Sequence, residues 1–269
     1  VTETAMIWGT VSGASMLGMV ISLLLSVGLP IFLGIFIYKK TKAWVPAFFI
    51  GCGIFVGFAM ILEQICHAIV LTVTGDVIRD NIWLYAIYGG LAAALFEECG
   101  RWIAMKFCLK KHLTRENALM YGAGHGGIEA FLILGMSSMS NLLTAAMING
   151  GLMEKTMTAL EPAQQEVTYH QLSVLWTTPA YQFYLAPVER ISAIALQIAL
   201  SILVYSAVKT GRKLHLAAAF GLHFAVDFLT VICAAAIPTW VLELGLLLVV
   251  AVICVVVYQL VYVQMAEKK

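Results

Sequence analysis

The sequence predicts an all-α membrane protein, a polytopic bundle of about seven transmembrane helices. Hydrophobic residues make up 61% of the 269 residues, charged residues only 12%, and the mean hydropathy is +0.92. A soluble domain of this length carries about twice that share of charge. The apolar residues also gather in runs long enough to cross a hydrocarbon layer of ~30 Å, which takes about 20 helical residues.

The apolar runs are the expected elements of one domain that covers residues 1–269. They span approximately residues 11–37, 44–72, 83–108, 117–140, 182–208, 214–236 and 240–264. The long connection at about 141–181 contains the turn signals NGG, EP and TTP. Its segment VTYHQLSVLW has apolar residues at helical spacing, so we expect part of the connection to lie along the membrane surface.

Basic residues are concentrated on alternate connections. They follow the first, third and fifth runs and end the chain: Lys39, Lys40, Lys42, Lys110, Lys111, Arg115, Lys209, Arg212, Lys213, Lys268 and Lys269. The other connections hold only Arg79 and Lys155. The positive-inside rule therefore places the N-terminus outside, the C-terminus in the cytoplasm and the 141–181 connection on the external side. The net charge of +1 says little about partners, but no block of like charge indicates a nucleic-acid surface, so no nucleic-acid partner is expected.

Ionisable residues inside the runs are the candidate functional residues, because such residues usually face a bundle interior or a water-filled cavity. Counted from the basic flanks at 1.5 Å per residue, polar groups on the third, fourth and sixth runs reach one depth, roughly 15–20 Å. Within each run, partners four residues apart share a helix face. This deep cluster consists of Glu97, Glu98, His125, Glu129, His223 and Asp227.

A second group lies about 20 residues from the basic flanks, near the external boundary. Glu63 and His67 are on the second run, and Glu189 and Arg190 are on the fifth. An ion pair of Arg190 with Glu63 or Glu189 explains this group without chemistry, because buried charges persist when they are paired. Glu98 and Arg101, three residues apart, are expected to form a similar pair in the deep cluster.

Hydrolysis of an amide or ester is the chemistry that suits the deep cluster. A buried carboxylate can act as a general base toward water. Alternatively, two histidines and a carboxylate can hold zinc, which activates a bound water. The four glycines around His125 in YGAGHGGIEA either let helices approach closely or leave room for a substrate backbone; beside a histidine and a glutamate they favour a site.

Three short motifs resemble a known group of membrane peptidases. EECGR, YGAGH and HFAVD are similar to the EExxxR, FxxxH and HxxxN/D motifs of the CAAX prenyl protease type II and bacteriocin-processing superfamily. The closest resemblance is to YhfC-type intramembrane peptidases, relatives of the PrsW group, and it covers about residues 50–260. The residues that carry it are Glu97, Glu98, Arg101, Tyr121, His125, His223 and Asp227.

The resemblance implies a function for each motif. Glu97 would activate water, His125 would help to hold that water, and His223 would donate to an oxyanion. Arg101 comes one residue earlier than in EExxxR, which turns it about 100° around the helix. Asp227 cannot donate while ionised, so it would orient His223 or bind a metal.

The sequence thus predicts an intramembrane peptidase that acts on a membrane-associated protein or peptide, in a bacterial plasma membrane if the resemblance holds. Two alternatives remain open. A proton- or ion-coupled transporter would use the same carboxylates and histidines, although no inverted repeat is visible. An inactive member of the peptidase fold would act as a binding or immunity protein. If zinc is present, its expected ligands are Glu97, His125, His223 and Asp227.

Overall fold

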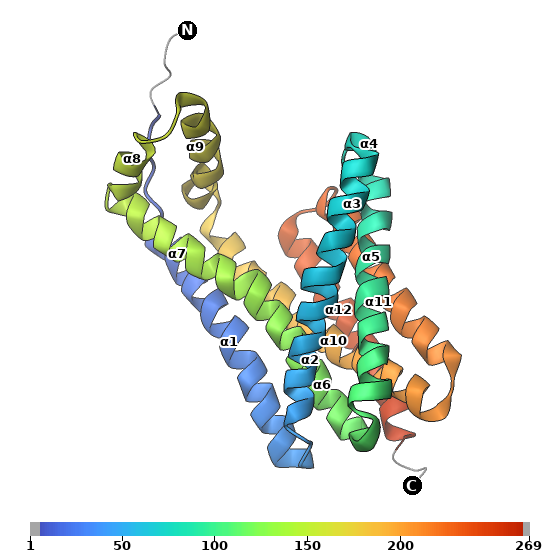
Figure 1. Cartoon of the computed structure of the whole chain (residues 1–269). Coiled ribbons are helices and arrows are strands. Elements are labelled where there is room, and N and C mark those ends of the chain that lie inside the picture. The colour runs from blue at the N-terminus through green and yellow to red at the C-terminus, as the bar shows by residue number, and fades with distance from the viewer. Residues whose placement is uncertain (1–5, 266–269) are drawn as a thin grey trace. The chain divides into compact units, whose positions relative to one another are not determined.

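A computed structural model describes residues 6–265, and helices account for all the regular structure in this range (Figure 1). The α-helices are α1 Gly13–Thr41, α2 Pro46–Phe55, α3 Gln64–Thr74, α4 Asp76–Arg79, α5 Ile82–Ile103, α6 Arg115–Ala130, α7 Met136–Asn149, α8 Leu152–Met157, α9 Pro162–Thr177, α10 Ala180–Thr210, α11 Lys213–Ala234 and α12 Thr239–Val257. Shorter π-helical turns continue several of them: η1 Val56–Glu63, η2 Ala104–Cys108, η4 Phe131–Gly135 and η5 Tyr258–Val263. Lys110–His112 (η3) is a 3₁₀ turn.

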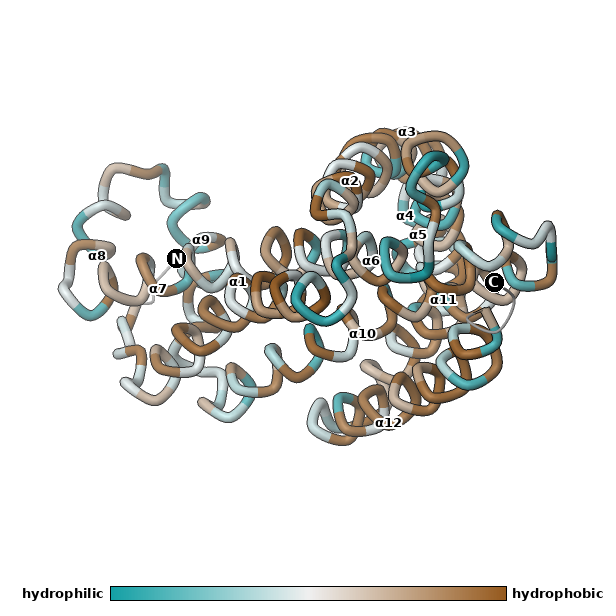
Figure 2. The backbone as a smooth tube through the Cα atoms, turned by 90° about the horizontal axis from the view of Figure 1, so that it is seen from below, coloured by the Kyte–Doolittle hydropathy of each residue, from teal (hydrophilic) through white to brown (hydrophobic). Residues whose placement is uncertain are grey.

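Within residues 6–265, seven helical segments are long and apolar enough to cross a membrane, which confirms the predicted fold class. They are Gly13–Thr41, Pro46–Thr74, Ile82–Cys108, Arg115–Asn149, Ala180–Thr210, Lys213–Ala234 and Thr239–Val263. Hydrophobic residues follow one another along most of α12 (Figure 2). The direction of the chain across the membrane stays a prediction, and Lys268 and Lys269 lie outside the described residues.

The fourth segment is longer than the sequence predicted. It continues to Asn149 because η4 joins α6 to α7 without a break. The rest of the expected 141–181 connection is mostly helical, and VTYHQLSVLW lies within α9. The prediction of a helix in this segment is therefore confirmed, whereas its position at a membrane surface stays a prediction.

The chain forms two compact units. The first comprises Val1–Val27 and Phe131–Pro187, with a small core that includes Met19, Ala145 and Leu175. The second comprises Gly28–Ala130 and Val188–Lys269 and contains the larger core, whose buried residues come largely from α6 and α10. All the residues of both predicted polar groups belong to the second unit.

Glycines bring α6 into backbone contact with its neighbours in the second unit. A Cβ atom on Gly124 would lie 1.9 Å from the carbonyl oxygen of Phe48 in α2. On the other side of α6, a Cβ on Gly122 would lie 2.7 Å from Cα of Ile198 in α10. These contacts show that the glycines around His125 serve close helix packing. Of the two alternatives that the sequence left open, the structure favours close packing, because neighbouring helices fill the space beside these glycines.

Candidate active site

A cavity of about 330 Å³ lies in the second unit, bordered by α5, α6, α10, α11 and α12. Its apolar wall includes Leu196, Val226 and Val250. The polar residues on its lining come from four different helices: Glu97, Glu129, Glu189, Arg190, Ser192, Gln197, Asp227, His223 and Thr230. A partly polar cavity between membrane-spanning helices can hold water within the span, and hydrolysis requires such water.

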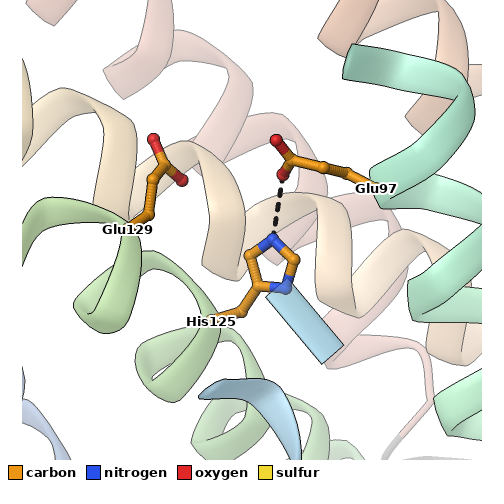
Figure 3. Close-up of side chains that lie close together, drawn as sticks. All are labelled: Glu97, His125 and Glu129. Carbon is orange, nitrogen blue, oxygen red and sulfur yellow. Dashed lines mark hydrogen bonds and ion pairs between the residues drawn. The ribbon is translucent and has the colours of Figure 1, made fainter. Parts of the chain in front are cut away.

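Glu97 and Glu129, which line this cavity, form a compact buried group with His125. His125 Nε2 donates to Glu97 Oε2 over 2.9 Å. One side-chain nitrogen or oxygen atom from each residue lies within 4.8 Å of the corresponding atoms of the other two residues. All three residues are buried. Both carboxylates and the imidazole point into the same space (Figure 3). The structure therefore brings together three of the residues that the sequence placed at one depth.

Gln197 of α10 is at the centre of the group, and the sequence analysis missed it. Its Nε2 donates to Glu97 Oε2 over 2.9 Å and to Glu129 Oε2 over 2.8 Å. It carries no charge, so a search for ionisable residues in apolar runs passes over it. The available signal was a single amide within ISAIALQIALS, a segment that is otherwise apolar apart from two serines.

Arg101 is fully buried and connects α5 with α10. Its Nη1 donates to the carbonyl oxygen of Gln197 over 2.7 Å and to Ser201 Oγ over 3.0 Å. Its Nε lies 3.3 Å from Glu98 Oε2, whereas its Nη2 lies 4.0 Å from Glu97 Oε2. The shorter ion pair is thus the one with Glu98, as the three-residue spacing predicted. Glu97 is left to face His125.

His223 of α11 lies between two carboxylates. Its Nδ1 is 2.8 Å from Glu98 Oε1, and its Nε2 is 3.5 Å from Asp227 Oδ2. Glu98 therefore holds the ring from one side, and Asp227 contacts it from the cavity side. Tyr121 contacts His125 in a similar way, because its hydroxyl lies 3.5 Å from Nδ1, the ring nitrogen that does not contact Glu97.

Glu189 and Arg190 of the second predicted group are joined to the first group, which corrects the expectation of two separate clusters. Arg190 forms the expected pair with Glu189, but its Nη1 also donates to Glu129 Oε1 over 3.1 Å. Glu129 lies one helical turn beyond His125, and the long arginine side chain covers the remaining distance. Glu63 instead contacts His67 at 3.2 Å, so it is not the partner of Arg190.

Comparison with known proteins relates this geometry to a family. The model of a family described as "YhfC intramembrane metalloprotease" matches residues 25–254, which include the whole cluster. The chain belongs to the YhfC family. A protein of Bacillus subtilis (strain 168), described as "Uncharacterized membrane protein YhfC", is 43% identical over 204 residues, which are 72% of this chain and 76% of that protein. No solved structure matches. The YhfC-family chain is an integral membrane protein.

The residues of this YhfC-family site fit a divalent metal. One imidazole nitrogen and two carboxylate oxygens are a donor set that catalytic zinc accepts, with a fourth position left for water. The charges point the same way. Five carboxylates (Glu97, Glu98, Glu129, Glu189 and Asp227) face two guanidinium groups (Arg101 and Arg190) and the imidazole of His223, so acidic groups still outnumber basic ones and a dication would offset part of the excess.

The fitted ligand set differs from the set that the sequence suggested. Glu97 and His125 are common to both sets, but in the structure the third side chain close to them is Glu129. Among the described residues, His223 and Asp227 do not join this group. His223 contacts Glu98 and Asp227 instead.

Proposed function

We propose that this YhfC-family chain is a metal-dependent intramembrane peptidase of a bacterial plasma membrane. Its substrate would be a membrane protein or peptide, and the peptide bond would be hydrolysed in the cavity between α5, α6, α10 and α11. The observation that carries the proposal is the buried group of Glu97, His125 and Glu129, whose donor atoms converge within spanning helices. The family description favours this activity over an ion-coupled carrier.

In the proposed site, Glu97, His125 and Glu129 would hold the metal. A divalent metal such as zinc, when bound there, polarises the scissile carbonyl and activates a water for attack. Glu97 Oε2 already accepts from His125 and Gln197, while no described residue donates to its Oε1. Oε1 is therefore the atom that we assign to accept the proton of the attacking water.

His223 would stabilise the developing oxyanion from the opposite helix. Glu98 occupies Nδ1, which fixes the ring so that Nε2 faces Asp227 and the cavity. Because the ionised Glu98 can only accept from Nδ1, a second hydrogen on Nε2 makes the ring an imidazolium. That hydrogen can be donated to the tetrahedral oxygen, and donors of this kind contribute about 10²–10³ in rate. Asp227 would orient the ring from the cavity side.

The experiment that tests the function compares the N-termini of membrane proteins in cells that produce wild-type or variant protein. Wild type should create new N-termini that are absent with Glu97→Gln and with His125→Ala, because both variants lose a group that handles the water. Glu166→Gln is the matched control, since this glutamate is exposed on α9. Identical N-termini for wild type and Glu97→Gln, at equal protein levels, would refute the proposal.

A companion variant separates the two neighbouring glutamates. Glu98→Gln should lower the stability of the protein as well as the rate, because it weakens the ion pair with Arg101 and the hold on His223. The measurement is the folded yield and melting temperature in detergent. A Glu98→Gln protein of wild-type stability with no cleavage would exchange the functions assigned to Glu97 and Glu98.

A further inference from the structure

Gln197 connects two carboxylates that belong to different helices. Glu97 is on α5 and Glu129 is on α6, and the Nε2 atom of Gln197 on α10 is within hydrogen-bond distance of both. α10 is the most buried of the spanning helices: 72% of its most apolar window is buried, against 17–33% for the other six. The amide is thus built into the interior of the bundle, away from lipid.

The orientation of this amide is determined by its surroundings. Nη2 of Arg101 contacts Gln197 Oε1, and a guanidinium group can only donate. The amide oxygen must therefore face Arg101. The NH₂ group then faces the two carboxylates, and this arrangement is consistent because an ionised carboxylate can only accept hydrogen bonds. Arg101 is itself anchored to α10 through Ser201 and the Gln197 carbonyl, so the amide cannot rotate without breaking several bonds.

The NH₂ group of Gln197 has two hydrogens, one for each of the two carboxylates. Glu97 Oε2 and Glu129 Oε2 carry like charges that repel each other in a medium of low dielectric constant. Each accepts one hydrogen of the same NH₂ group, which keeps the two oxygens close together. Together with His125, the same two side chains form the group that can hold a metal.

We infer that Gln197 is the positioning residue of the metal site, an inference that rests on the proposed function. A carboxylate oxygen has two lone pairs, and those of Glu97 Oε2 now accept from His125 and Gln197. If His125 binds a metal through Nε2, its ring hydrogen is carried on Nδ1, which faces the Tyr121 hydroxyl. Nε2 then no longer donates to Glu97, and one lone pair of Oε2 is free. Gln197 can keep the other, so its hydrogen bonds are compatible with the occupied site.

The test is the affinity of the purified full-length protein for Zn²⁺, measured in detergent by competition with a chelating dye. Gln197→Met keeps the approximate shape of the side chain but removes both donors, and it should weaken binding by about 10- to 100-fold. Gln197→Ala leaves space that a water molecule can fill, and this water can donate to both carboxylates. Alanine should therefore weaken Zn²⁺ binding less than methionine does.

Ser206→Ala is the matched control on the same helix. Ser206 is buried and hydrogen-bonded to His215, away from the cavity, so its replacement should leave Zn²⁺ affinity unchanged. Melting temperatures in the presence of chelator show whether each variant folds without metal. A variant that melts like wild type but binds Zn²⁺ more weakly has lost positioning rather than structure.

Three outcomes would overturn the inference, and they are distinguishable from one another. If wild type and Gln197→Met bind Zn²⁺ equally while Glu97→Gln does not, Gln197 has no positioning function but the metal site stands. If alanine is worse than methionine, Gln197 acts by filling space. If wild type binds no Zn²⁺ at all, the metal site fails and the inference fails with it.

Discussion

Replacement of Gly124 by alanine tests whether the backbone contact between α2 and α6 positions His125. The added methyl group would lie 1.9 Å from the carbonyl oxygen of Phe48 and 2.6 Å from its carbonyl carbon. These are backbone atoms, which cannot rotate away as a side chain can. The two helices would have to separate by roughly 1 Å before the shortest contact reached 3.0 Å.

The expected cost has a thermodynamic part and a functional part. Overpacking of this kind costs about 1–3 kcal/mol. At about 2–4 °C per kcal/mol, the melting temperature should fall by about 2–12 °C. His125 is the next residue along α6, so the same shift moves its imidazole relative to Glu97 on α5. A misplacement of 1 Å in an active site can reduce the rate of catalysis by about 10².

The assay is thermal unfolding in detergent with chelator, followed by Zn²⁺ titration of the folded fraction. Gly53→Ala is the matched control on α2, because a Cβ there meets no atom within 4 Å. In a helix that replacement should be neutral or stabilise by about 0.5–1 kcal/mol. A Gly124→Ala protein with the melting temperature and Zn²⁺ affinity of wild type would refute the positioning argument.

Three further predictions concern the metal, the outer ion pair and the topology. Removal of metal with 1,10-phenanthroline should abolish cleavage and added Zn²⁺ should restore it; chelator-resistant cleavage would point to catalysis by Glu97 alone. Arg190→Ala should lower the folded yield, because it leaves Glu129 and Glu189 without their counter-ion. Breaking a fully buried ion pair costs about 3–5 kcal/mol. A smaller loss is expected here, because Glu189 is partly exposed. In a background without the native cysteines, an impermeant maleimide should label Gln165→Cys in intact cells and Lys111→Cys only after permeabilisation; labelling of both from one side would contradict the predicted orientation.

The sequence was sufficient for the spans and for part of the site. Hydropathy identifies a spanning helix because each span must be apolar over about 20 residues, whatever its neighbours are. Depth along a helix follows from a constant rise per residue, which is why Glu97 and His125 were expected to meet. The contact of Arg101 with Glu98 followed from helical spacing alone.

The remaining features depend on which faces of different helices contact one another. The spacing of residues within a single helix carries no information about these contacts. Gln197 contributes no charge, and its importance arises only from three contacts with other helices. Glu129 was placed with His125, but its link to Arg190 needed the length of an arginine side chain and the position of α10. The packing function of Gly124 likewise became visible only with α2 in place.

The assembly of the site from separate spans has a consequence for biogenesis. α5 belongs to the least apolar of the seven segments, with a hydropathy of 1.2, and it enters the membrane before α10 and α11 have been synthesised. Gln197 follows Arg101 by 96 residues and His223 follows Glu98 by 125. At a synthesis rate of about 5–20 residues per second, Gln197 and His223 are added to the chain roughly 5–25 s after Arg101 and Glu98. During that interval the ion pair between Glu98 and Arg101, which lies within α5, is available to reduce the cost of inserting its charges.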